Sequence, residues 1–107
     1  MKFSLERVTR SDGLCIAVAG EVDAYTAPKL RAQLLDAVRE HPVVTVDLSA
    51  VTFMDSQGLT ALLTARQQAE VHRASLRLDG VPARVLKLLQ LTGLDSMFRF
   101  SVDSTEH

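Results

Sequence analysis

At 107 residues the chain has room for one domain, and 47% apolar residues are enough for a core without disulfides or a structural metal. Its formal net charge is −1, with 12 basic and 13 acidic residues mixed along the chain, which excludes the clustered basic surface of a nucleic-acid-binding protein. No segment approaches the roughly 20 apolar residues that span a bilayer, and no secretory signal is seen. We therefore expect a cytoplasmic protein with neither a membrane nor a nucleic-acid partner.

Two β-strands are predicted at the start of the chain. Phe3 and Leu5 alternate with polar residues, which is typical of a half-exposed strand. The turn residues 11–13 separate this strand from an apolar run at 14–19, which predicts a buried strand that ends at Gly20. The two strands should form a hairpin.

A helix and a third strand are predicted next. Thr26 is a suitable N-cap, and Pro28 falls in the first turn, where its missing N–H costs little. Apolar residues then repeat with helical spacing as far as His41-Pro42; they are Ala27, Leu30, Leu34, Ala37 and Val38. Residues 43–48 are apolar at nearly every position, as in a central parallel strand that is covered on both faces.

A second helix begins at Asp55-Ser56. One side of it carries apolar groups, and the other side carries hydroxyls and amides. The apolar side consists of Leu59, Leu62, Leu63, Ala69 and the stem of Arg66, and the polar side consists of Gln57, Thr60, Thr64 and Gln68.

The remaining elements repeat the alternation of strand and helix. A short strand around 76–78 is followed by a third helix that starts at Pro82. Gly93 is placed for a left-handed helix cap, with Leu94 behind it as the usual hydrophobic contact. Met97, Phe98 and Phe100 predict a last strand.

The order β-β-α-β-α-β-α-β predicts an α/β domain. Strands separated by helices imply right-handed crossovers and parallel pairing, whereas the opening hairpin is antiparallel. The sheet should therefore be mixed, with about five strands and helices packed on it. We assign residues 1–102 to this domain and expect residues 103–107 to be a disordered tail.

No catalytic or metal-binding pattern is present. The scattered single glycines do not form a phosphate-binding or dinucleotide-binding loop, and Ser56 lacks the surroundings of a nucleophile elbow. The three histidines lack metal-ligand spacing, and the single Cys15 cannot complete a zinc site. We expect no enzymatic activity, no cofactor, no metal, and a buried, reduced thiol at Cys15.

The junction between the third strand and the second helix has two interpretations. Asp55 or Ser56 can simply cap the free N–H groups of the helix. Alternatively, the Ser56 hydroxyl is a switch, because helix N-termini favour anions and phosphorylation adds about −1.5 to −2 charge. Gly58 either lets another surface approach the helix closely or packs against the sheet.

A family resemblance rests on this junction and two other segments. Residues 47–59, Asp-Leu-Ser-x-Val-x-Phe-x-Asp-Ser-x-Gly-Leu, resemble the signature of STAS-domain anti-sigma factor antagonists. Gly20-Glu21-Val22-Asp23 with Thr26-Ala27, and Leu91-Thr92-Gly93-Leu94 with Phe98-Arg99-Phe100, resemble two further segments of that family. The matches occur in the family's order and span nearly the whole chain.

The resemblance implies a regulatory role. Ser56 corresponds to the serine that is phosphorylated by an anti-sigma factor, itself a serine kinase, and a PP2C-type phosphatase reverses the reaction. In its unphosphorylated state such a protein, a monomer or weak dimer, binds the anti-sigma factor and frees the sigma factor. The implied partner-binding residues are Asp23, Asp55, Ser56, Gln57, Gly58, Thr60 and Thr64. We expect the family's final helix to be absent or very short after Val102.

Alternatives remain for the function and for Asp23. A non-phosphorylated STAS subunit of a stressosome or of a lipid-transport complex is the competing function, although such subunits often lack a serine at this place. Asp23 either faces the partner or closes an Asx-turn before the first helix. If the second and third strands are parallel neighbours, Asp23 and Ser56 lie at the same edge of the sheet.

Overall fold

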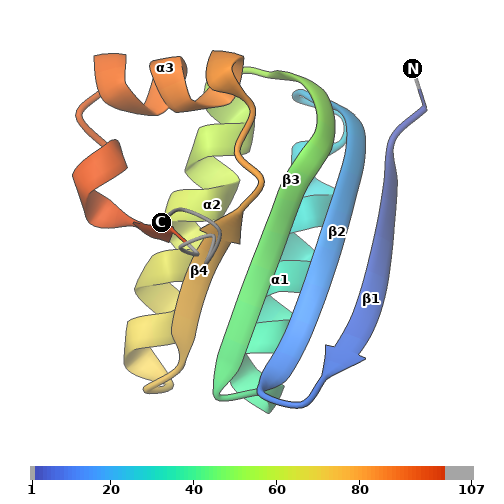
Figure 1. The fold of residues 1–107 in the computed structure, drawn as a ribbon, viewed down its shortest axis with the longest axis vertical. Coiled ribbons are helices and arrows are strands. Elements are labelled where there is room, and N and C mark those ends of the chain that lie inside the picture. Colours follow the sequence, from blue (N-terminus) through green and yellow to red (C-terminus); the bar gives the residue numbers. More distant parts are fainter. Residues whose placement is uncertain (1, 101–107) are drawn as a thin grey trace, which may run out of the picture.

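The predicted order of strands and helices is confirmed by the computed structural model, which describes residues 2–100 (Figure 1). The predicted tail at 103–107, and the question of a final helix, lie outside these residues. The elements are β1 (Ser4–Arg10), β2 (Gly13–Val22), α1 (Ala27–Glu40), β3 (Val43–Met54), α2 (Ser56–Val71), β4 (Ser75–Asp79), α3 (Ala83–Leu91), a 3-10 turn (Asp95–Met97) and β5 (Arg99–Phe100).

The five strands form one mixed sheet in the order β1-β2-β3-β4-β5. β1 and β2 form the predicted antiparallel hairpin, and the other neighbours are parallel. β3 is paired with β2 as far as Met54, but with β4 only from Val43 to Asp47. The C-terminal half of β3 therefore has a single strand beside it among the described residues.

The prediction that both faces of β3 are covered is wrong, and the positions of the helices explain why. Each crossover steps one strand in the same direction, so right-handed connections bring successive helices to the same face. Figure 1 shows α1 and α2 side by side behind the sheet. Within residues 2–100 no helix covers the opposite face of β3. Thr45 and its β2 neighbour Cys15 lie on that face and are nevertheless buried.

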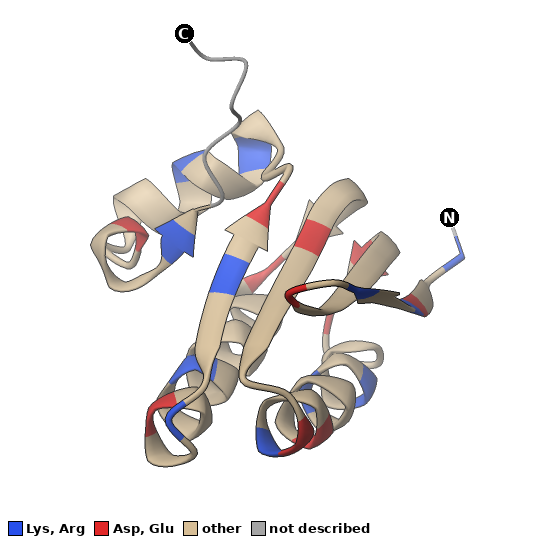
Figure 2. Ribbon diagram, turned by 60° about the horizontal axis from the view of Figure 1, so that its bottom comes forward, with Lys and Arg blue, Asp and Glu red and all other residues tan. Residues whose placement is uncertain are grey.

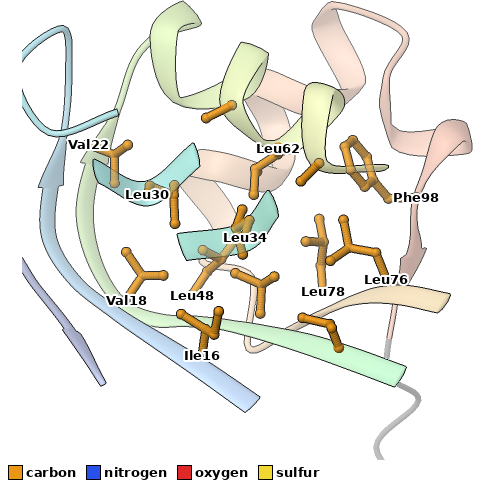
Figure 3. Packing of buried hydrophobic residues seen from close by; sticks show 14 of the residues in the cluster. Ile16, Val18, Val22, Leu30, Leu34, Leu48, Leu62, Leu76, Leu78 and Phe98 are labelled. Carbon is orange, nitrogen blue, oxygen red and sulfur yellow. The ribbon is translucent and has the colours of Figure 1, made fainter. Parts of the chain in front are cut away.

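The core fills the space between the sheet and the helices (Figure 3). Every residue of the predicted stripe on α1 is buried. On α2 the prediction was less accurate, because Leu63 is only half-buried while the small residues Gly58, Ala61 and Ala65 are buried. Small side chains give a weak hydrophobic signal in the sequence, but they allow α2 to lie close against its neighbours.

Three strand boundaries differ from the predicted ones. β2 continues past Gly20, whose φ of +92° accommodates an irregularity in the pairing with β3. β3 extends beyond residue 48 to Met54. β5 begins at Arg99, later than predicted, because residues 95–97 form a 3-10 turn.

The predicted end of α3 is confirmed. Gly93 has a φ of +74°, and the N–H of Leu94 donates to the carbonyl of Leu89 at 2.9 Å. Leu94 packs against the core, as expected for this type of helix cap. None of the helices in the described part of the chain is both long enough and apolar enough to cross a membrane.

Candidate functional site

The C-terminal ends of β2 and β3 bring two loops together. Val22 is the register partner of Met54, and the backbone N–H of Asp55 donates to the carbonyl of Val22 at 3.2 Å. Asp23 follows Val22 directly, so the loop that carries it starts beside the N-terminus of α2. The expectation that both loops emerge at one edge of the sheet is confirmed.

Asp55 caps α2 and leaves Ser56 available. The Oδ1 of Asp55 accepts hydrogen bonds from the N–H groups of Gln57 at 2.9 Å and Gly58 at 3.4 Å. Ser56 is the first residue of α2 and is exposed. Its carbonyl accepts from the hydroxyl of Thr60 at 2.9 Å, but its own hydroxyl has no hydrogen-bond partner among residues 2–100. The capping role and the exposed hydroxyl thus belong to different residues.

Asp23 closes the Asx-turn that was one of its two interpretations. Its Oδ1 accepts from the N–H groups of Tyr25 at 3.0 Å and Thr26 at 3.1 Å. Thr26 occupies the predicted N-cap position of α1, but its hydroxyl makes no cap bond to the helix. That hydroxyl donates to the carbonyl of Glu21 at 2.9 Å instead, so it fixes the loop. A partner-facing role for Asp23 stays a prediction.

The hydrogen bonds at Asp23 predict a pH-dependent stability. Desolvation acts to raise the pKa of Asp23, but the hydrogen bonds from the N–H groups of Thr26 and Tyr25 outweigh it and hold this pKa below its ordinary value. A carboxyl group with a lowered pKa stabilises the fold above its unfolded pKa, and that stability is lost as the pH falls through the folded pKa. We expect the stability difference between the wild type and Asp23→Asn to shrink from about pH 5 towards pH 2.

Urea unfolding across this pH range measures that difference. Glu21→Gln is the matched control, because Glu21 is an exposed neighbour whose carboxylate makes no hydrogen bond within the described residues. Wild-type and Asp23→Asn stabilities that run parallel at every pH would contradict the assigned role of the carboxylate.

The other predicted partner-binding residues differ in accessibility. Gln57 and Thr60 are exposed, and Thr64 is half-buried. Gly58 is buried, and a Cβ atom at this position would lie 2.6 Å from the Cγ of Met54 and 2.9 Å from the Cγ1 of Val22. The structure therefore supports the packing interpretation of Gly58.

Two exposed aromatic residues at this edge were not among the site residues predicted from the sequence. Tyr25 is 88% exposed in the loop after β2, and Phe53 is 42% exposed near the end of β3. A shallow hollow of about 80 Å³ lies between the first turns of α1 and α2 and is lined partly by Pro28, Gln57 and Thr60. The exposure of Tyr25 could have been inferred from sequence, because this tyrosine lies among residues that are typical of a turn.

The charges of the edge are set by its loops. Acidic residues lie at or near the C-terminal ends of the three central strands, and elsewhere both signs are interspersed (Figure 2). These acidic residues are Glu21, Asp23, Asp55 and Asp79, whereas Asp47 lies in the middle of β3. No group of three His, Cys, Asp or Glu side chains that could hold a metal ion occurs within residues 2–100. The edge thus combines carboxylates, exposed aromatic rings and one accessible hydroxyl.

Comparison with known proteins identifies the family. A family model described as "Mlab, STAS domain" matches residues 6–99, so the chain belongs to the STAS-domain family. Within that family it belongs with the anti-sigma factor antagonists, as the resemblance predicted. The anti-sigma-B factor antagonist of Listeria monocytogenes is 38% identical over 99 residues, which cover 91% of this chain and 87% of the relative. That of Bacillus subtilis is 27% identical over 104 residues, which cover 97% and 95%.

Solved structures agree with the fold. An anti-sigma factor antagonist from Mycobacterium paratuberculosis matches with a TM-score of 0.85 and 24% identity, over 98% of this chain and 90% of that one. The unphosphorylated form of the anti-sigma factor antagonist SpoIIAA matches with a TM-score of 0.71 and 22% identity, over 98% and 92%. The fold is therefore that of proteins in this regulatory class.

Proposed function

We propose that this chain is a phosphorylation-controlled anti-sigma factor antagonist. With Ser56 unmodified, it binds an anti-sigma factor that is a serine kinase, and the sigma factor is released. Phosphorylation of Ser56 by that kinase ends the binding, and a PP2C-type phosphatase restores it. The observation that carries the proposal is the exposed Ser56 hydroxyl, which has no hydrogen-bond partner in the described structure and lies at a helix terminus already capped by Asp55.

The position of Ser56 separates it from other nearby hydroxyl groups. Ser49 and Thr52 are also exposed, but both belong to β3, whose backbone is held by the pairing with β2. Ser56 lies beyond the last pair of that ladder. We therefore expect Ser56 to be the one residue that the kinase modifies.

Mass spectrometry after incubation with the cognate kinase, ATP and magnesium tests this expectation. Phosphate is expected on Ser56 alone, and Ser56→Ala should accept none while still binding the kinase. Phosphate on Ser49 or Thr52 with Ser56 unmodified would show that the switch residue has been wrongly assigned.

The partner should bind the edge that holds Asp23, Asp55, Ser56 and the exposed start of α2. Tyr25→Ala is expected to weaken binding by about tenfold or more, because exposed tyrosines are frequent binding hot spots. Thr60→Ala and Thr64→Ala should weaken it as well. Gln33→Ala is the control, since Gln33 lies on α1 and accepts a hydrogen bond from Arg7 of β1 at 3.2 Å. Calorimetry that ranks Gln33→Ala as the most damaging change would place the interface elsewhere.

The proposal includes a cytoplasmic monomer or weak dimer without enzymatic activity. The alternative is a non-phosphorylated STAS subunit of a stressosome or of a lipid-transport complex. A stressosome subunit elutes as a large particle in size-exclusion chromatography, whereas the proposed switch protein elutes at the size of one or two chains. A lipid-transport subunit would bind its partner without ever accepting phosphate from a kinase.

A further inference from the structure

A second candidate site lies at the opposite end of α2 from Ser56. Residues from the C-terminal end of α2, the start of β4 and the segment leading into β5 line an open cavity of about 430 Å³. A helical rise of about 1.5 Å per residue puts this cavity on the order of 25 Å from Ser56. We call it the α2–β5 pocket; Arg66, Arg73, Arg99, Leu76, Met97 and Phe98 are among its lining residues.

The positive charges that line the α2–β5 pocket outnumber the negative ones. Three arginines line it, against a single carboxylate, Glu70. Glu70 pairs with Arg66 at 3.1 Å. Neither Arg73 nor Arg99 has a carboxylate within 4.0 Å anywhere in residues 2–100. The pocket therefore has an excess of two positive charges, which suits an anionic ligand.

The backbone at Arg73 is a second, independent indication. Arg73 has a φ of +58°, a left-handed conformation that glycine adopts without strain and other residues adopt rarely. The bond from the Ala74 N–H to the Ala69 carbonyl, at 2.7 Å, holds it in this helix-ending turn. An arginine at a position suited to glycine keeps a guanidinium at the pocket at a cost in backbone strain, which points to a use for that group.

The uncharged part of the wall narrows the ligand class. Leu76 and Phe98 are buried, and Met97 is 37% exposed, so one side of the pocket is apolar. A volume of 430 Å³ is within the usual range of small-molecule sites. We propose that the α2–β5 pocket binds a small organic anion in which a phosphate or carboxylate group is joined to an apolar ring. The anionic group contacts Arg73 and Arg99, and the ring lies against Met97 and Phe98.

Titration of the full chain with naphthyl phosphate, followed through backbone amide resonances, tests the proposal without any protein partner. Resonances of residues 73–76 and 96–99 are expected to shift, whereas those of residues 55–60 should not. Arg73→Gly should weaken binding by about tenfold or more, the usual effect of losing a hydrogen bond to a charged group. Its melting temperature should be equal or higher, because glycine relieves the strain. Arg39→Gln, at an ion pair with Asp36 on α1, is the control and should bind normally.

Two results would overturn the proposal. One is a set of shifts confined to residues 55–60, which would make the N-terminus of α2 the anion site; the other is unchanged affinity in Arg73→Gly. The sequence continues past Phe100 with the acidic residues Asp103 and Glu106, so the Asp103→Asn, Glu106→Gln double variant is titrated as well. Equal or somewhat tighter binding to that variant supports the proposal. Binding to that variant alone would mean that the chain supplies its own anion, and would overturn it.

Discussion

Phosphorylation of Ser56 is expected to weaken binding to the anti-sigma factor by roughly thirtyfold to several thousandfold while the fold stays intact. Such a loss corresponds to about 2 to 5 kcal/mol, the usual cost of leaving a charge buried and unpaired at an interface. The phosphate dianion would have to be desolvated against partner groups that complement a neutral serine. Nearly all of the free-energy change caused by phosphorylation is therefore expected in partner binding.

Within the chain, the opposing effects at Ser56 are small. The Ser56 hydroxyl gives up no hydrogen bond to any described residue when it is modified. A phosphate at the N-terminus of α2 gains about 0.3 to 1 kcal/mol from the helix dipole. The neighbouring carboxylate of Asp55 repels it by a comparable amount, reduced by salt. These contributions nearly cancel, so the free energy of unfolding should change by less than about 1 kcal/mol.

The decisive measurement is paired: partner affinity and thermal unfolding of the phosphorylated and the unmodified protein. Ser56→Ala provides the neutral control and should match the unmodified protein in both. A melting temperature lowered by more than about 8 °C exceeds what 1 kcal/mol produces in a domain of this size. That outcome would mean that the switch acts by unfolding, and the interface mechanism would be abandoned.

Gly58→Val is expected to destabilise the fold by about 2 kcal/mol or more, in contrast to phosphorylation of Ser56, which should leave the stability of the fold nearly unchanged. Even the first added carbon would lie 2.6 Å from the Met54 Cγ and 2.9 Å from the Val22 Cγ1. Val22 is fully buried and stiff at χ1, so it has little freedom to move aside. The start of α2 would have to shift away from the ends of β2 and β3.

Urea unfolding and thermal melting measure this loss, which should lower the melting temperature by roughly 8 °C or more. Gln57→Val is the matched control, because it introduces the same side chain one position earlier on the exposed surface of α2. A loss in Gly58→Val no larger than that in Gln57→Val would contradict the close packing at Gly58, because valine is itself a better helix former than glycine. The two experiments together distinguish a buried residue in the first turn of α2, which determines stability, from an exposed residue in the same turn, which determines binding.

Local chemistry explains why much of the fold and the candidate site were predictable. The apolar stripe of α1 has strict helical spacing and is entirely buried. Asp55 has the right side chain for an N-cap and is one. Asp23 precedes a helix by a few residues, so its Asx-turn could be anticipated from sequence. In each case the residues that decide the structure are close neighbours in the chain.

Features that depend on distant contacts were not predictable. The continuation of β3 through residues 49–54 rests on pairing with β2, because these residues alternate too irregularly to signal a strand. The exposure of Tyr25 arises because no helix or strand within residues 2–100 packs over that loop. The α2–β5 pocket needs β5 to pair with β4 before Arg99 and Arg73 can line one cavity.

The unequal pairing of β3 has a consequence for the kinetics of local opening. Beyond Asp47 this strand is hydrogen-bonded to β2 and to no other described strand, whereas its first half is held by strands on both sides. Amide hydrogens in residues 49–54 should therefore exchange with solvent through small local fluctuations, faster than those in residues 43–47. Within β3, the half that is held less firmly is the one that leads into Ser56, the proposed phosphorylation site. The proposed phosphorylation site thus lies next to the more easily deformed half of β3, while the half between β2 and β4 stays paired.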